Sequence, residues 1–418
     1  MLKIFFSKIK TNLYLIIPII CIVLWAIYTF IQFYFINHLS LHFDFSERVR
    51  EAYVMVTDPE NLYHSKATYH ALPSQILLFL IFLLFPLVVA NRIYFVINTF
   101  LGILTVYEFN KILKFMDIKE KLTKFIFLMI ISNGFVIFHQ FWLGNVKFIV
   151  ESILFFIIRR ELQCRKGIIE KNLKYYFINY GFFLLALGIY PPFIYLLFIY
   201  LFQNIRHPNL FKKKSIQQFT IIIFWFALQN FIIFIYPSLI LDLFRCYFTF
   251  YSAFGSELPF FYLGSFGLSL EPANILFITN ITNIIILLIT LILIFNKKLT
   301  IEFKFAYFCL ASIYVGSFAG RVLVVILPFT LLIFIQFLRE EKKFLNFLKN
   351  NKILILGLIG IIGIYFIIEN NNTYYKYIPI LEFYPYRLFF DLRYIYFLVI
   401  LGFSVIKLHL SKIKIKKL

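Results

Sequence analysis

Long apolar runs, separated by short basic connections, follow one another along almost the whole chain. A helix of about 18–20 apolar residues spans a hydrocarbon core of about 30 Å, because each residue rises about 1.5 Å. The pattern predicts an all-α fold, a polytopic transmembrane helical bundle of about 12–13 spans, some of them short enough to be tilted or half-helices. The candidate spans are 11–36, 73–90, 93–110, 122–139, 145–159, 175–189, 191–204, 215–236, 273–295, 303–317, 322–338, 352–369 and 391–408.

Composition supports a membrane environment. Of the 418 residues, 62% are hydrophobic and 15% are charged, and the mean hydropathy is +0.86. Soluble domains are roughly half apolar and one quarter charged, so a water-soluble globule could not bury this much apolar surface. The cysteines are scattered without metal-ligand spacing, and no disulfide framework is predicted. They are Cys21, Cys164, Cys246 and Cys309.

The net charge of +21 is concentrated in short clusters at the ends of the apolar runs. Lys and Arg mark the cytoplasmic loops of membrane proteins. The clusters near the ends of the chain therefore predict cytoplasmic N- and C-termini in a multi-pass protein of the cell membrane, with the lipid bilayer and not nucleic acid as its surroundings. Segments 37–72, 237–272 and 370–390 are then external.

This topology contains one conflict. Two cytoplasmic termini require an even number of crossings, whereas the candidate spans are odd in number. The basic stretch 111–124 also indicates a cytoplasmic loop, although two crossings after an external first loop would place it outside. We therefore expect one segment between residues 72 and 124 to be re-entrant or interfacial.

The first external loop carries the largest group of polar residues. Apolar residues recur at helical spacing over 45–56, which predicts a short interfacial helix. The residues expected to share its apolar face are Val49, Ala52, Tyr53 and Val56. Asp44 precedes the helix, where its carboxylate could act as an N-cap or as a general base. His38 and His42, four residues apart, are weak candidates for a divalent metal site with Asp44.

Three motifs follow one another in the first half of the chain. The second, His139-Gln-Phe-Trp-Leu-Gly-Asn145-Val-Lys147, opens a span, and the third, Gly188-Ile-Tyr190-Pro-Pro, lies at the crest of a predicted helical hairpin. The first motif comprises Asp44, Ala52, Tyr53, Leu62, Tyr63 and Pro73. Together they resemble the membrane-embedded C-type glycosyltransferase superfamily, most closely its polyprenol-phosphate-mannose-dependent mannosyltransferase-like branch.

The resemblance covers roughly residues 40–205, and the chain departs from the family pattern at each motif. A Tyr-Pro-Pro is degraded here to Tyr69-His-Ala-Leu-Pro73. Asn145 and Lys147 stand where the family has Gln and Asn. The Lys of a Lys-x-x-Pro is missing before Pro191 and Pro192, which leaves open which cation would meet a donor phosphate there.

The resemblance implies a single membrane domain over 1–418, with a catalytic module at 1–205 and a variable C-terminal helical module at 206–418. It implies a hexosyltransferase that moves a sugar from a polyprenyl-phosphate donor to a lipid, glycan or protein acceptor on the outer face. Asp44 would be the catalytic base, since a carboxylate can deprotonate an acceptor hydroxyl.

The other residue roles follow from the same chemistry. Guanidinium groups bind phosphate through charge-assisted hydrogen bonds, which makes Arg50, Arg245 and Arg321 the candidate donor-phosphate ligands. Arg321 could instead simply extend its charge to the membrane interface. The residues expected to line the substrate cavity are Tyr53, Tyr63, His139, Asn145, Lys147 and Tyr190. The one candidate cofactor is a divalent metal, for which His38 and His42 are weak candidate ligands.

Two other classes of protein fit the pattern. A polymerase or flippase for undecaprenyl-linked glycans also has about a dozen helices and a large external loop, and would depend on arginines in 237–272. A secondary transporter would need polar or charged residues at mid-membrane. The few candidates for that role are Glu151, Gln229 and Asn230.

Overall fold

The computed structural model describes the backbone of residues 2–36, 43–62, 72–132, 141, 146–189, 194–205, 213–242, 284–285, 287–296, 299–315, 329 and 332. Every element in these ranges is a helix, and no strand occurs in them, which confirms the predicted all-α class. The chain divides into two compact units, residues 1–252 with 290–297 and residues 253–289 with 298–418. All described helices up to residue 242 belong to the first unit.

The N-terminal apolar run is one long helix. α1 (Leu2–Phe30) continues into a π-helical stretch, η1 (Ile31–Ile36). The 25 residues from Asn12 to Ile36 have a mean hydropathy of 2.5, and α4 (Leu87–Phe115) is the second described helix that is long and apolar enough to cross a membrane. Length and composition alone are weak evidence for a membrane span, since the core helix of a soluble protein or a signal sequence can be equally long and apolar.

The predicted continuous span 73–90 is wrong. The structure places there a short helix, α3 (Pro73–Phe79), and a 3₁₀ turn, η3 (Leu80–Leu84), which end at an extended Phe85. Pro86 lacks an N–H and forces the residue before it out of the helical region, so a new helix, α4, begins at Leu87. The segment 73–84 rises only about 20 Å, less than a bilayer core of about 30 Å.

The remaining predicted spans 122–204 correspond to helices with shifted ends. The predicted span 215–236 corresponds to α10 and α11, which are separated at Asn230, where the chain leaves the helical conformation. Spans 322–338, 352–369 and 391–408 lie outside the described residues or almost wholly so. The helices are α5 (Lys121–Ile131), α7 (Lys147–Arg165), α8 (Leu173–Ile189), α9 (Ile194–Asn204), α10 (Lys213–Gln229), α11 (Phe231–Ile235) and, in the second unit, α15 (Ile301–Val315).

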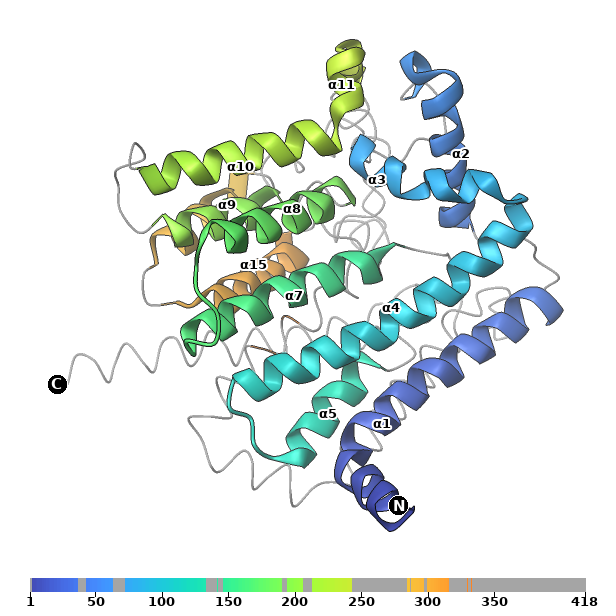
Figure 1. The fold of residues 1–418 in the computed structure, drawn as a ribbon, viewed down its shortest axis with the longest axis vertical. Coiled ribbons are helices and arrows are strands. Elements are labelled where there is room, and N and C mark those ends of the chain that lie inside the picture. The colour runs from blue at the N-terminus through green and yellow to red at the C-terminus, as the bar shows by residue number, and fades with distance from the viewer. Residues whose placement is uncertain are drawn as a thin grey trace, which may run out of the picture. The chain divides into compact units, whose positions relative to one another are not determined.

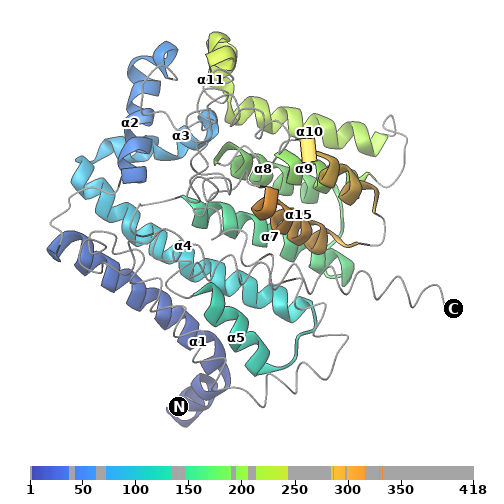
Figure 2. The ribbon, with the colours of Figure 1, turned by 180° about the vertical axis from the view of Figure 1, so that it is seen from behind.

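Within the first unit the long helices pack side by side in the order α1, α4, α7, α8, α10 (Figures 1 and 2), with α5 against α1. The α4–α7 interface combines an aromatic pair, Phe109 and Phe155, with centroids 5.2 Å apart, and a hydrogen bond of 2.9 Å between Thr105 Oγ1 and Ser152 Oγ. Apolar shape and one satisfied polar pair thus fix the register of these two helices.

Two glycines on α8 allow close contacts. A Cβ on Gly181 would lie 2.6 Å from the Trp225 ring of α10, and a Cβ on Gly188 would lie 1.8 Å from Ser74 Oγ of α3. The backbone N–H of Leu72 donates to the carbonyl of Gly188 across the second contact (3.2 Å). These small residues dock α10 along α8 and hold the start of α3 at the end of α8.

Candidate functional site

The first predicted external loop contains the predicted short helix. α2 spans Phe43–Thr57, and a 3₁₀ turn, η2, spans Pro59–Asn61. Because α2 begins at Phe43, Asp44 lies in its first turn and not at the predicted N-cap position before the helix. The structure describes the backbone of Asp44 but not its side chain.

An aromatic cluster holds α2 in place. The Phe45 ring is buried and lies 5.9, 5.1 and 4.7 Å, centroid to centroid, from the rings of Phe79, Phe82 and Tyr94. These partners belong to α3, η3 and α4. Aromatic pairs at such distances add to the stabilisation that comes from buried area alone, so the start of α2, including Asp44, is anchored on three other elements.

This anchoring corrects the predicted apolar face of α2. Val49 and Ala52 are buried as expected, but Tyr53 and Val56 are 59% and 62% exposed. Met55 is buried in their place. The face that contains Phe45 turns inward because the aromatic cluster lies on that side, and Tyr53 is thereby directed away from the packed surface.

The charged residues of α2 differ in their surroundings. Arg48 Nη1 lies 2.8 Å from Glu51 Oε2, and these side chains are only 12% and 3% exposed. Glu47 Oε2 is buried and has no hydrogen-bond partner. Arg50 is exposed, with no hydrogen bond or ion pair recorded to any residue that the structure describes. A free guanidinium of this kind is available to a phosphate.

The other predicted site residues are only partly described. Lys147 is buried and begins α7. The rest lie outside the described residues: His38, His42, Tyr63, His139, Asn145, Tyr190, Arg245 and Arg321. The structure therefore brings together Asp44, Arg50 and Tyr53 on one helix, and the wider grouping stays a prediction.

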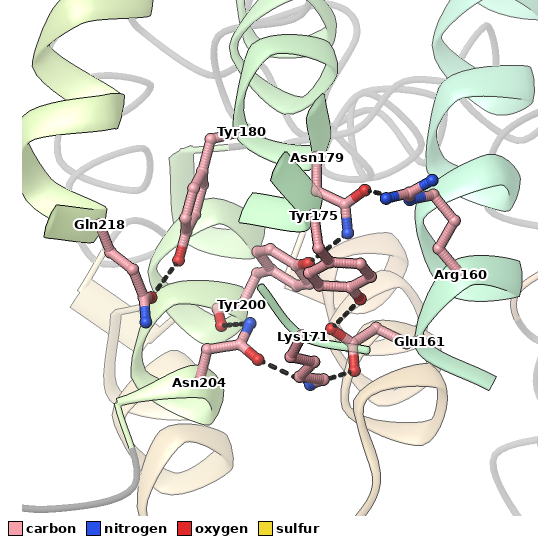
Figure 3. A network of polar contacts seen from close by, with 9 residues as sticks. All are labelled: Arg160, Glu161, Lys171, Tyr175, Asn179, Tyr180, Tyr200, Asn204 and Gln218. Atoms are coloured by element: carbon pink, nitrogen blue, oxygen red, sulfur yellow. Dashed lines mark hydrogen bonds and ion pairs between the residues drawn. The ribbon is translucent and has the colours of Figure 1, made fainter. Parts of the chain in front are cut away.

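A second polar site, which we call the polar network, was missed by sequence reasoning (Figure 3). It connects α7, α8, α9 and α10 at the C-terminal end of α7 and the N-terminal ends of α8 and α10. Its members are Arg160, Glu161, Lys171, Tyr175, Asn179, Tyr180, Tyr200, Asn204 and Gln218.

Glu161 is the centre of the polar network. Its carboxylate is buried and accepts from the Tyr175 hydroxyl at Oε1 and from Lys171 Nζ at Oε2. Lys171 also donates to Asn204 Oδ1 at 2.8 Å. A buried carboxylate with an ionic partner and a hydroxyl donor is satisfied at both oxygens, which explains how α7 tolerates it.

Asn179 and Tyr180 of α8 connect the polar network to α7, α9 and α10. Arg160 Nε donates to Asn179 Oδ1 at 2.7 Å, and Asn179 Nδ2 donates to the Tyr200 hydroxyl at 2.7 Å. The Tyr180 hydroxyl donates to Gln218 Oε1 at 2.7 Å. Each of these bonds joins different helices, so the network locks four helix ends together.

Ion pairs extend the same end of the bundle. Glu108 of α4 pairs with Arg159 of α7, and Lys166 pairs with Asp117 in the turn after α4. Burial raises the pKa of the nearby Cys164 thiol, because an apolar environment disfavours the thiolate. The sequence pattern predicts only an orientation from the short basic clusters at the ends of the apolar runs, and one such cluster lies at the end of α7. The structure shows that several of its members also have specific partners.

A small cavity adjoins the network. Its volume is about 110 Å³, and it is open on one side. It is lined by Lys171, Asn172, Leu173, Tyr176, Gln217, Gln218 and Ile221. No group of three His, Cys, Asp or Glu side chains that could hold a metal occurs among the residues that the structure describes.

Comparison with known proteins adds no family. No protein-family model matches the chain, and a search of curated proteins gives no match. The resemblance to C-type glycosyltransferases therefore rests on the three sequence motifs alone.

Proposed function

We propose that this chain is a multi-pass membrane glycosyltransferase that moves a sugar from a polyprenyl-phosphate donor to a lipid, glycan or protein acceptor on the outer face of the cell membrane. The observation that carries the proposal is the position of Asp44. It lies in the first turn of a short helix between α1 and α3, and the buried Phe45 next to it anchors that turn on the aromatic cluster.

The exposure of the two long apolar helices supports a membrane location. Only 22% of the apolar window in α1–η1 and 33% of that in α4 is buried. Large side chains such as Phe35, Val96 and Phe100 are mostly exposed. A water-soluble protein would bury such helices in its core, because exposed apolar area costs about 25 cal/mol per Å². Lipid removes that cost.

The break at Pro86 also supports the proposed topology. If 73–84 does not cross the membrane, one candidate span is removed and an even number remains, as two cytoplasmic termini require. α4 then runs from the outer to the inner face and leaves the basic stretch 111–124 in the cytoplasm, in agreement with its charge. α2 and η2 precede this crossing and are external in this arrangement.

The proposed reaction is a direct transfer of the sugar from the donor phosphate to the acceptor hydroxyl at the outer surface. The Asp44 carboxylate takes the proton of the acceptor hydroxyl as its oxygen forms a bond to the anomeric carbon. The bond between that carbon and the phosphate oxygen breaks, and the polyprenyl phosphate leaves with the electron pair. Arg50, exposed on the same helix, stabilises the phosphate charge.

Asp44→Asn tests the proposal, because it keeps the size of the side chain and removes the proton acceptor. Loss of a general base lowers turnover by about 10²–10⁴-fold, so sugar transfer by purified protein should fall by that order while donor binding persists. A purely structural role in the first turn of α2 predicts almost no change in turnover, since loss of a favourable charge at a helix N-terminus costs only about 0.3–1 kcal/mol of stability. Retained transfer would favour the polymerase or flippase.

The structure selects the controls. Glu60→Gln is the neutral one, because Glu60 is an exposed carboxylate in the same loop. Glu47 is not neutral, since its Oε2 is buried without a partner. If Glu47→Gln abolishes transfer and Asp44→Asn does not, Glu47 is the base.

One observation favours a second candidate, the secondary transporter. Glu151 of α7 is fully buried, and neither carboxylate oxygen has a hydrogen-bond partner. Ionisable residues inside membrane bundles commonly mark ion or substrate pathways.

A further inference from the structure

The cavity beside the polar network lies between the N-terminal parts of α8 and α10. In the proposed topology both helices start at the cytoplasmic face, so the cavity lies at the inner membrane interface, far along the helices from α2. Its volume of about 110 Å³ holds a few water molecules or one small polar group.

Two of the side-chain acceptors that line this cavity, on Asn172 and Gln218, are already used by the protein. Asn172 Oδ1 accepts from the backbone N–H of Tyr175 at 2.9 Å and so caps α8. Gln218 Oε1 accepts from the Tyr180 hydroxyl at 2.7 Å. Both oxygens of the neighbouring Glu161 are taken as described above. Among the side-chain amides that line the cavity, the exposed Gln217 alone leaves its oxygen free for a ligand that donates hydrogen bonds.

Donor groups remain on the same side chains. The amide nitrogen of Gln218, a side chain that is 97% buried and lines the cavity, has no partner among the described residues. The same holds for the amide nitrogen of Asn172. The ammonium of Lys171 has three N–H donors, of which Glu161 and Asn204 take two. The cavity therefore presents donors to an acceptor-rich group.

Charge and helix geometry also favour an acceptor-rich, negatively charged group in the cavity. Leu173, the first residue of α8, lines the cavity, and no described group accepts from its backbone N–H. Free N–H groups and the helix dipole favour an anion at such a position. Lys174 follows Leu173 in α8, Lys213 begins α10 one turn before Gln217, and both are exposed, as is the opposing carboxylate of Glu170 before α8.

From these observations we infer that the cavity binds a phosphate-type oxyanion, supplied by the headgroup of an inner-leaflet anionic lipid or by free phosphate. Gln218 and Asn172 donate through their amide nitrogens and Lys171 through its third N–H. The inference goes beyond sugar transfer, so Asp44→Asn protein should bind the anion as the wild type does.

Two substitutions isolate the donors without removing a structural bond. Gln218→Glu keeps the acceptor for Tyr180 and replaces the amide nitrogen by a negative oxygen. Asn172→Asp does the same and still caps α8. Gln163→Glu is the control, because it adds the same charge near this end of α7 and Gln163 does not line the cavity.

The experiment titrates full-length protein in detergent with inorganic phosphate and measures the midpoint of thermal unfolding, which rises when a ligand binds the folded state. We expect Gln218→Glu and Asn172→Asp each to weaken phosphate binding by about ten-fold or more, since each loses a charge-assisted hydrogen bond and adds repulsion. Gln163→Glu should bind nearly as the wild type does.

Nanodiscs then distinguish the two sources. A rise in the unfolding midpoint with phosphatidic acid over phosphatidylcholine, lost in Gln218→Glu, assigns the site to a lipid headgroup. A response to inorganic phosphate alone assigns it to free phosphate. No response of the wild type to either probe, or equal binding by all three variants, overturns the inference. The midpoint of each variant without ligand shows whether it is folded.

Discussion

Gly188 of α8 and Ser74 of α3 approach so closely that a Cβ on Gly188 would lie 1.8 Å from Ser74 Oγ. Ser74 also donates its backbone N–H to Asn230 Oδ1 at 3.2 Å, and its hydroxyl is buried. The start of α3 is thus held between the end of α8 and the junction of α10 with α11.

Gly188→Ala should therefore destabilise the fold. The new methyl would force Ser74 Oγ to move and would still lie 3.0 Å from Ser74 Cβ, and overpacking of this kind costs about 1–3 kcal/mol. Gly102→Ala is the control, because its Cβ would meet Phe148 and Ile22 at 3.4 Å, and Ala favours a helix over Gly by about 0.5–1 kcal/mol. Thermal unfolding in detergent should show a lower midpoint for the first variant only. Equal midpoints would contradict the close contact.

The same region shows what sequence patterns could and could not predict. Helix class and most helix positions follow from apolar run length alone, as α7, α8 and α9 demonstrate. Pro86 is a local signal for the break before α4, but it lies within an uninterrupted apolar run, and that run predicts one continuous span. The break at Asn230 depends on the hydrogen bond to Ser74, 156 residues away in sequence, and no local pattern contains that information.

The sequence predicts α2 but not the polar network, again because contacts between residues distant in sequence leave no local pattern. The spacing of apolar residues that predicts α2 lies within its own sequence. Which face of α2 turns inward depends on rings from α3, η3 and α4. The partners of Glu161 are a tyrosine of α8 and a lysine of the turn before α8, and that lysine in turn donates to Asn204 of α9. Only the antiparallel packing of α7 on α8 brings them together.

Cysteine labelling tests the proposed topology. In a variant without the native cysteines, Glu60→Cys in η2 should react with a membrane-impermeant maleimide in intact cells, because the residue is exposed and would be external. Ile168→Cys, in the exposed turn between α7 and α8, should react only after permeabilisation. The reverse pattern would place Asp44 in the cytoplasm and exclude the proposed function.

Removing one hydroxyl tests the polar network. Tyr175→Phe leaves Glu161 Oε1 without its donor, and an unsatisfied buried acceptor costs about 1–3 kcal/mol. The free energy of unfolding in detergent should fall by that amount. Tyr107→Phe is the control, since that residue is half-exposed and surface changes stay within about 0.5 kcal/mol. Equal effects of the two substitutions would show that the Glu161 contact contributes little.

Glu151 and Glu161 lie on the same helix and provide the final comparison. Glu161 is paired with Lys171 and Tyr175, whereas both oxygens of Glu151 are buried without a partner. Replacing an unpaired buried polar group by an apolar one is neutral or stabilising. Breaking a buried ion pair by removing one partner costs about 3–5 kcal/mol. We expect Glu151→Leu to keep or raise the thermal midpoint and Glu161→Leu to lower it.

Activity of the Glu151→Leu protein then separates the two candidate functions. A glycosyltransferase with its base at Asp44 should retain sugar transfer, because α7 would contribute packing at this position and not chemistry. A secondary transporter that couples to an ion at Glu151 should lose gradient-driven uptake in proteoliposomes while remaining folded, since the carboxylate is the only group of this side chain that can bind a cation or a proton. A folded Glu151→Leu protein that loses sugar transfer would instead add Glu151 to the transferase site and contradict the assignment of the reaction to the first loop alone.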